Sequence, residues 1–233
     1  MLKPYEIKHF IDEDKASHKK RMAGQGLKYY EGEHKIMASR IFYVDADGQV
    51  REDTLRSNVR ISHPFFTELV DQQVQYMLSG DGNFIRSDNP DLQKQLDLYF
   101  NDGFWAEVYE MLTGCISKGF DYMYAYYTAD GRIGFQHADS MGVVEVQAKD
   151  ADDKQDHVIY WYIDRIEKGK RTVKRIQVWD KKETYYYVQV NDGRIIEDRE
   201  EKLNPRPHIV TENEKGERFG ASFNFIPFFR LDN

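Results

Sequence analysis

The sequence predicts an α+β protein in which N-terminal helices pack against an antiparallel sheet of hairpins. Apolar residues recur at helical spacing between Pro64 and Gly119, and strand-like segments dominate from Asp121 onward. Three Asp-Gly pairs are typical of hairpin turns: Asp47-Gly48, Asp130-Gly131 and Asp192-Gly193. Aromatic residues make up 14% of the 233 residues, which also favours strands.

Residues 1–56 are expected to form an N-terminal unit of one helix and one hairpin. The helix is predicted over 12–31, where acidic residues come early and basic residues later, the order that suits a helix dipole. Gly24 and Gly26 weaken this helix, so we expect it to bend or end before the Tyr-Tyr pair that follows. The hairpin is predicted over 40–53.

Residues 57–233 are expected to form the main α+β body, with helices over 64–119 and antiparallel strands over 121–198. Its first helix is predicted from Pro64 to Ser79, because Pro is tolerated at a first helical position and the Gly that follows suits the position after the last turn. Its apolar residues fall on one helical face: Phe66, Val70, Val74, Met77 and Leu78.

Two further helices are predicted as an antiparallel pair, because the link between them, Asn101-Asp102-Gly103, is short. The first begins at Asn89-Pro90, a capping residue followed by a first-turn Pro. Its apolar stripe consists of Leu92, Leu96, Tyr99 and Phe100. The second ends at Gly119, and its stripe consists of Phe104, Val108, Met111, Leu112 and Cys115.

From Asp121 onward the pattern predicts strands. A hairpin is expected over 121–137, a short strand over 143–147 and a polar loop over 149–156. Four long strands are expected next, over 157–166, 172–180, 183–190 and 194–198. Residues 199–222 are polar and irregular, and a short apolar segment follows them.

Composition excludes several classes of protein. The net charge is −7, whereas a dedicated binder of duplex DNA is usually basic. A single cysteine, Cys115, allows no intramolecular disulfide and fits a reducing compartment. The sequence has neither a signal peptide nor an apolar run long enough to span a membrane, so we expect a protein made and kept in the cytoplasm or in something assembled there.

No catalytic, cofactor or metal site is predicted. None of the seven histidines has i, i+4 spacing with another or belongs to a Cys/His cluster, and phosphate-binding glycine motifs do not occur. Cys115 lies on an apolar helical stripe, which favours a core position over a nucleophile. Asp45 and Asp47-Gly48 lack the third ligand of a calcium loop, so we expect a type I′ turn there.

Two charged segments allow functional interpretations. Asp150, Asp152, Asp153 and Asp156 could hold Mg²⁺ in a nuclease, although such a run in one polar loop is more often solvated. Residues 165–182 hold eight basic and two acidic residues, a local charge of +6. They could contact nucleic acid or a partner, or form the solvated face of a sheet. The candidate contact residues are Arg165, Lys168, Lys170, Arg171, Lys174 and Arg175.

Four blocks, in order along nearly the whole chain, resemble the N-terminal region of tailed-bacteriophage portal proteins, in the branch typical of phages of Gram-positive bacteria. The first is MAGQGLKYYEGEHKIMASR (22–40). The second runs from Asn58 to Gly80 and includes Phe66, Leu69, Val70, Asp71, Val74, Tyr76 and Leu78. The third comprises Gly114, Gly119, Tyr122, Tyr124, Tyr126, Asp130 and Gly131, and the fourth comprises Phe219, Gly220, Ile226, Pro227, Phe228, Phe229 and Asn233.

The resemblance departs from the family pattern at two places. The family's Gly-x-Pro after the helix is replaced by Gly80-Asp81-Gly82-Asn83, and the insert between Gly220 and Ile226 is longer than expected. The part resembled is the α+β wing. The stem, clip and crown would follow it and are absent from this sequence, so the chain resembles about half of a portal protein.

The resemblance implies a structural, non-enzymatic subunit of a homo-oligomeric ring, a dodecamer, at one vertex of the capsid. The implied partners are terminase, scaffold and capsid proteins, head-tail connector proteins and the double-stranded DNA that passes through, with no membrane. The implied location is the portal vertex of the virion, after assembly in the host cytoplasm. Two alternatives remain: a phage-encoded metal-dependent nuclease and a DNA-binding module that uses the basic hairpin.

Overall fold

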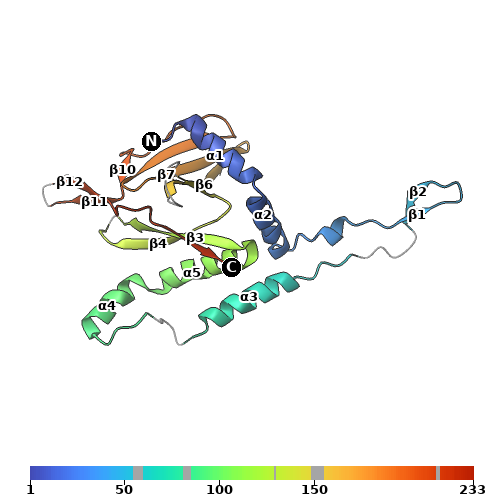
Figure 1. Ribbon diagram of the computed structural model, residues 1–233, viewed down its shortest axis with the longest axis horizontal. Coiled ribbons are helices and arrows are strands. Elements are labelled where there is room, and N and C mark those ends of the chain that lie inside the picture. Colours follow the sequence, from blue (N-terminus) through green and yellow to red (C-terminus); the bar gives the residue numbers. More distant parts are fainter. Residues whose placement is uncertain (55–59, 81–84, 129, 148–154, 214–215) are drawn as a thin grey trace.

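The computed structural model describes residues 1–233 except 55–59, 81–84, 129, 148–154 and 214–215. It confirms the α+β class (Figure 1). The helices are α1 (Pro4–Ala16), α2 (His18–Tyr30), the 3₁₀ turn η1 (Lys35–Ala38), α3 (Phe65–Leu78), α4 (Pro90–Tyr99) and α5 (Asp102–Lys118). The first strands are β1 (Phe42–Val44), β2 (Val50–Glu52), β3 (Phe120–Tyr127), β4 (Ile133–Ala138), β5 (Val143–Gln147) and β6 (Gln155–Glu167). The later strands are β7 (Arg171–Trp179), β8 (Glu183–Val190), β9 (Ile195–Glu197), β10 (Arg206–Pro207), β11 (Ile209–Glu212), β12 (Arg218–Ala221) and β13 (Phe228–Asp232).

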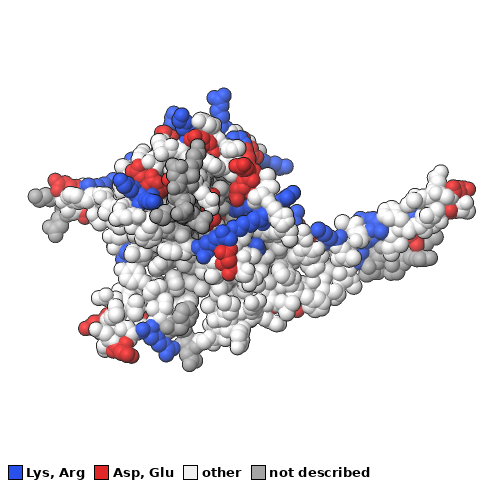
Figure 2. All heavy atoms as spheres, in the orientation of Figure 1, with Lys and Arg blue, Asp and Glu red and all other residues white. Residues whose placement is uncertain are grey.

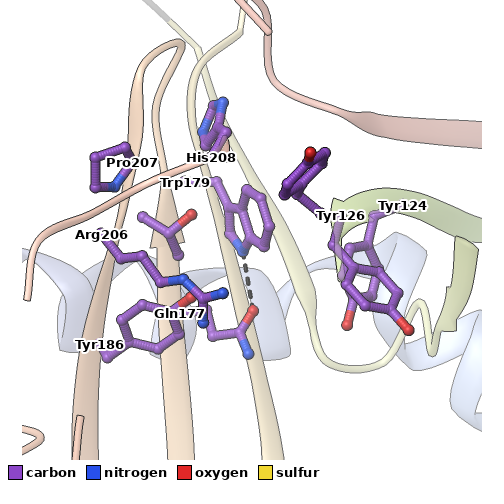
Figure 3. A pocket seen from close by; sticks show the side chains of 10 residues that line it. Tyr124, Tyr126, Gln177, Trp179, Tyr186, Arg206, Pro207 and His208 are labelled. Atoms are coloured by element: carbon purple, nitrogen blue, oxygen red, sulfur yellow. Dashed lines mark hydrogen bonds between the residues drawn. The ribbon is translucent and has the colours of Figure 1, made fainter. Parts of the chain in front are cut away.

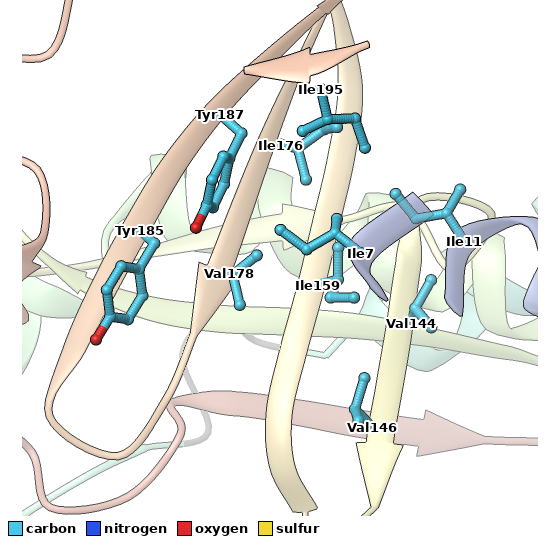
Figure 4. Packing of buried hydrophobic residues seen from close by; sticks show 10 residues of the cluster. All are labelled: Ile7, Ile11, Val144, Val146, Ile159, Ile176, Val178, Tyr185, Tyr187 and Ile195. Atoms are coloured by element: carbon cyan, nitrogen blue, oxygen red, sulfur yellow. The ribbon is translucent and has the colours of Figure 1, made fainter. Parts of the chain in front are cut away.

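Two antiparallel sheets form the centre of the molecule. The larger has the order β10-β8-β7-β6-β5, with β9 paired to β8, and the smaller has the order β13-β3-β4. Helix α1 covers the outer face of the larger sheet, where Ile7 and Ile11 pack among alternate residues of the strands (Figure 4). Those strand residues are Val144, Val146, Ile159, Ile176, Val178, Tyr185, Tyr187 and Ile195.

An aromatic core lies between the two sheets. Tyr124 of β3 stacks on Phe228 of β13, with ring centroids 5.0 Å apart, and the ring of Trp179 from β7 lies 5.7 Å from that of Tyr124. Val143 and Val158 of the larger sheet complete this cluster. Successive side chains of a strand point to opposite faces of its sheet. Strands β6 and β7 therefore supply side chains both to the core beneath α1 and to the aromatic core between the sheets.

A helical layer covers the other face of the smaller sheet. Helix α5 packs on β3 and β4, and α2 and α3 pack against α5. Their shared core is formed by Val70, Val74 and Leu112, with Phe66, Leu78, Val108 and Leu231 at its edge. The order of layers is therefore helix, sheet, sheet, helix, and α2 links the two outer layers (Figure 1).

Buried charged groups meet at the turn of residues 139–142, which carries the chain from one sheet to the other. Asp121 is 0% exposed and accepts hydrogen bonds from the Ser140 N–H (2.6 Å) and His137 Nε2 (2.9 Å). The ammonium of Lys118 lies 2.9 Å from the Asp121 carboxylate and donates to Asp139 at 2.6 Å. Although burial alone would raise the pKa of Asp139, the Lys118 charge lowers it below its ordinary value.

Lys20 of α2 reaches the same turn from the helical side. Its buried ammonium donates to the carbonyls of Ser140 and Val143 and lies 3.0 Å from the Asp14 carboxylate. Burial lowers the pKa of this ammonium, and the Asp14 charge opposes that shift. A buried ammonium is tolerated only with such partners.

The predicted helix over 12–31 is wrong at its start and its break. Two helices occupy the segment, and the break falls at Ser17, whose Oγ accepts a hydrogen bond from the Lys20 N–H and so caps α2. Gly24 and Gly26 do not end the helix. A Cβ on Gly26 would lie 2.1 Å from the Ser117 carbonyl oxygen, so this Gly allows α2 and α5 to touch.

The predicted antiparallel pairing of α4 with α5 is also wrong. Helix α5 packs against α2 and α3, whereas α4 continues beyond the end of α5 and projects from the body (Figure 1). No residue of α4 is buried, and of its predicted apolar stripe the C-terminal residue Phe100 packs on the body, with its ring 4.8 Å from that of Phe104 and 6.0 Å from that of Phe135. A short link is compatible with a bend as well as with a reversal.

The three Asp-Gly pairs that were predicted to form hairpin turns do so: Asp47-Gly48, Asp130-Gly131 and Asp192-Gly193. The turn at Asp45–Gly48, however, is closed by a hydrogen bond from the Gly48 N–H to the Asp45 carbonyl, with Gly48 left-handed (φ 75°). That is the geometry of a longer loop rather than of the type I′ turn that we expected. Residues 199–222, expected to be irregular, contain three short strands: β10, β11 and β12.

The close crossing of α2 and α5 generates a matched pair of substitutions. We expect Gly26→Ala to destabilise the protein by about 1–3 kcal/mol, because the methyl group would meet a backbone carbonyl that cannot move freely. Gly24→Ala, whose methyl group would meet only the Met141 side chain at 3.5 Å, is expected to be neutral or to stabilise by about 0.5–1 kcal/mol. Urea denaturation of both variants measures this, and equal effects would contradict the tight crossing.

Candidate interaction surfaces

The basic segment forms a hairpin, but its charges point in different directions. Strands β6 and β7 pair in register until a bulge between Ile163 and Arg165, where Asp164 is the extra residue. Alternation then places Arg175 on the face of the sheet opposite Lys174. Lys174 lies on the α1 side, 5.6 Å from the Trp161 ring, and pairs with Asp192 at 2.5 Å.

Acidic residues of the segment 197–201 neutralise the two central arginines. Arg175 lies 2.7 Å from Glu200, 3.5 Å from Glu201 and 3.9 Å from the buried Asp198. Arg165 lies 2.6 Å from Asp164, 3.0 Å from Glu167 and 3.2 Å from Glu200. The arginines and this segment line a cavity of about 200 Å³ together with Val173 and Val188. Carboxylates therefore occupy the positions at which these arginines could have met phosphate groups.

Two of the six candidate residues keep an accessible charge. Arg171 pairs with Glu167 at 3.2 Å, but Lys168 and Lys170 are exposed at the turn and form no ion pair with a described residue. Lys170 has a left-handed backbone (φ 68°), as does Gly169 (φ 83°), which turns the chain sharply there. The hypothesis of a nucleic-acid contact remains a prediction. Within the hairpin, these two lysines are the candidates whose charge is not paired with a described residue.

Sequence reasoning missed the acidic partners because they lie far along the chain. Glu200 is 25 residues from Arg175 and 35 residues from Arg165. Strand β9 returns the chain alongside β8, and this return brings the acidic segment to the basic strands. The run Glu197, Asp198, Glu200, Glu201 was the available signal, because opposite charges on neighbouring segments tend to pair.

An aromatic pocket of about 100 Å³ lies between β3 and the end of the larger sheet (Figure 3). Tyr124, Tyr126, Trp179 and Tyr186 line it together with Arg206 and His208. Burial lowers the pKa of His208, which favours its neutral imidazole. The residues that line the pocket include no carboxylate and no cysteine or serine nucleophile, and its volume suits a few waters better than a substrate.

Other candidate chemistry finds little support among the described residues. No group of three or more His, Cys, Asp or Glu side chains there could hold a metal ion. Of the acidic run considered for Mg²⁺, Asp150, Asp152 and Asp153 lie outside the described residues, and Asp156 pairs with His157 at 3.0 Å. Cys115 is buried, which raises the pKa of its thiol. None of the described helices has the length and apolarity needed to cross a membrane.

Charge is distributed unevenly over the face seen in Figure 2. Acidic and basic side chains are interspersed over the half that holds the sheets, whereas the layer of α3 and α5 is mostly white among the described residues (Figures 1 and 2). The lower layer therefore offers a weakly charged surface, which is the kind that protein partners cover more readily than nucleic acid.

Comparison with known proteins matches nearly the whole chain. The sequence model of the family described as "Phage portal protein, SPP1 Gp6-like" matches residues 8–231. The portal protein of Bacillus phage SPP1 is 25% identical over 204 residues, which cover 88% of this chain and 39% of that relative. The chain thus spans well under half of the length of this curated relative.

The arginine cluster generates a stability prediction. We expect Arg175→Leu to destabilise the protein by about 1–3 kcal/mol, because it leaves the buried Asp198 and its neighbours without their cation. Arg171→Leu, on the same strand but exposed, should cost less than about 0.5–1 kcal/mol. Thermal and urea unfolding compare the two, and an Arg175 variant as stable as the Arg171 variant would show that the cluster is not structural.

The exposed lysines generate a binding prediction. If the turn contacts DNA, Lys168→Ala with Lys170→Ala should weaken duplex binding and reduce the slope of log affinity against log salt by about 0.9 for each lysine. Fluorescence anisotropy across a salt series measures this slope. Lys181→Ala with Lys182→Ala, which removes the same charge at the other end of strand β7, is the control. An unchanged slope would remove the hairpin as a DNA contact.

Proposed function

The chain belongs to the SPP1 Gp6-like family of phage portal proteins, and we therefore propose that it is a structural subunit of a portal ring. In this proposal the ring stands at one vertex of the capsid, and the phage genome enters and leaves through it. The observation that carries the proposal is the family match over residues 8–231, which leaves little of the chain for another role.

We propose that this chain corresponds to the wing of the portal, because it matches only part of a longer relative. It aligns with 39% of the SPP1 portal protein, and its layered α+β body agrees with the wing that the sequence resembles. In this proposal the stem, clip and crown belong to the remainder of a longer protein. The wing positions the channel-forming parts and presents surfaces to other subunits.

The proposed partners follow from this role. They are further copies of the same protein in a closed ring, proposed as a dodecamer, and the terminase, scaffold, capsid and head-tail connector proteins. Double-stranded DNA is the passing cargo. The proposed location is the portal vertex of the virion, after assembly in the host cytoplasm.

The portal protein family is structural, which supports a non-catalytic role for this chain. No specific observation favours a nuclease, and the proposal therefore includes no catalytic residue.

The test of this proposal is the assembly state of the full-length protein that contains this chain. We expect native mass spectrometry and negative-stain electron microscopy to give closed rings of uniform subunit number, because repeated head-to-tail contacts close on themselves. A protein that stays monomeric across concentration and salt would contradict the proposal. Subunit numbers that vary without closure, as in filaments, would contradict it as well.

A further inference from the structure

The β1–β2 hairpin has an apolar face that no described residue covers. It pairs Val44 with Val50 and Phe42 with Glu52, so Phe42, Val44 and Val50 share one face, on which they are 57%, 65% and 70% exposed. Tyr43 and Arg51 share the other face. The hairpin projects far from the body (Figure 1). An isolated two-stranded hairpin is marginally stable in water, so this pattern indicates a strand pair that is buried by contact with another molecule.

Both arginines of this arm (the described residues 35–54) form ion pairs within it. Arg51 lies 2.5 Å from Asp45, and Arg40 lies 3.4 Å from Glu52. Asp45 also accepts the N–H groups of Asp47 and Gln49, which fixes the turn. Guanidinium groups paired in this way have little to offer phosphates. The chemistry of the arm therefore fits an apolar protein surface rather than nucleic acid.

A second uncovered apolar surface lies at the opposite end of the long axis. Helix α4 exposes Leu92 and Tyr99 by 46% and 37%, on the stripe that the sequence predicts to be buried (Figure 1). The outer side of α3, which lies between α4 and the arm in Figure 1, adds Phe65, Leu69 and Tyr76. These residues recur at i, i+4 and i+11 on the side away from Val70 and Val74. Helix α3 belongs to the weakly charged layer of α3 and α5 seen in Figure 2.

We propose that the arm of one copy docks on α4 and the outer stripe of α3 of the next copy. This inference rests on the proposed ring, whose subunit contacts it assigns. Two different uncovered surfaces at opposite ends of one chain are what a head-to-tail contact requires, because each subunit then gives one surface and receives on the other. A two-fold contact would instead pair the same patch with itself.

The size of the arm fits this role. Its large apolar side chains are each at least 45% exposed, and they include Ile36, Met37 and Ile41 besides the hairpin residues. Together they offer on the order of 700 Å², close to the roughly 800 Å² that each partner buries in a stable interface. Because Tyr43 lies on the other face of the hairpin, the arm supplies a large part of one subunit contact rather than all of it.

Cross-linking between copies tests the contact directly. Full-length protein with Val44→Cys is mixed with full-length protein carrying Leu92→Cys, and a short bis-maleimide is added. Cys115 is buried and stays in every variant, so wild type measures its background. We expect a covalent dimer in the mixture and not in either variant alone. Replacing Leu92→Cys by Ile166→Cys, at a position 70% exposed on β6, is the matched control.

Disruption of the arm separates this inference from the proposed function. We expect Phe42→Asp with Val44→Asp to raise the concentration at which half of the protein is assembled by tenfold or more. Its near-ultraviolet circular dichroism should be unchanged, because the hairpin lies outside every core. Ile166→Asp is the control. Rings from the arm variant that form as readily as wild type, or mixtures that give no arm-to-α4 cross-link, would overturn the docking while the ring stands. Wild type that forms no ring would overturn both.

Discussion

The buried charges at the turn of residues 139–142 are the constraint on which the rest of the structure depends. The turn connects the two sheets, and Asp121 from β3 and Lys20 from α2 hold it from opposite sides. Neither charge reaches water, so each needs its partners in one arrangement only. A shift of the turn would leave a carboxylate or an ammonium unpaired in a medium of low dielectric constant. The relative positions of α2, β3, β4 and β5 are thereby tied together.

The turn of residues 139–142 and its buried charges belong to a fixed body, from which other parts of the chain extend. The body has two sheets, an aromatic core between them and helices on both outer faces, so it satisfies its own apolar surfaces. The β1–β2 hairpin and α4 do not, although each carries apolar residues on one face, as buried elements do. In such a subunit the central body buries its own apolar surfaces, whereas the β1–β2 hairpin and α4 leave theirs exposed. This is the division that a ring-forming structural protein needs.

Sequence reasoning succeeded where local signals decide the structure. The helix over Phe65–Leu78 and the hairpins at the Asp-Gly pairs follow from periodicity and turn chemistry, within a residue or two. It failed where packing between distant segments decides. Ser17 rather than the glycines breaks the N-terminal helix, because Gly26 serves the contact with Ser117. The ion pairs of Arg165 and Arg175 with Glu200 were not predicted, because Glu200 lies 35 and 25 residues away from them in the sequence.

Cryo-electron microscopy of the ring formed by the full-length protein tests the central claim most directly, that this chain is a ring subunit completed by its neighbour. The proposal predicts a closed ring in which each body retains its helix, sheet, sheet, helix order. It also predicts that the arm of each subunit lies on α4 and α3 of the next, with Phe42 and Val44 in the contact. Closed rings whose arms extend into solvent, or particles in which the arm folds back on its own body, would contradict it.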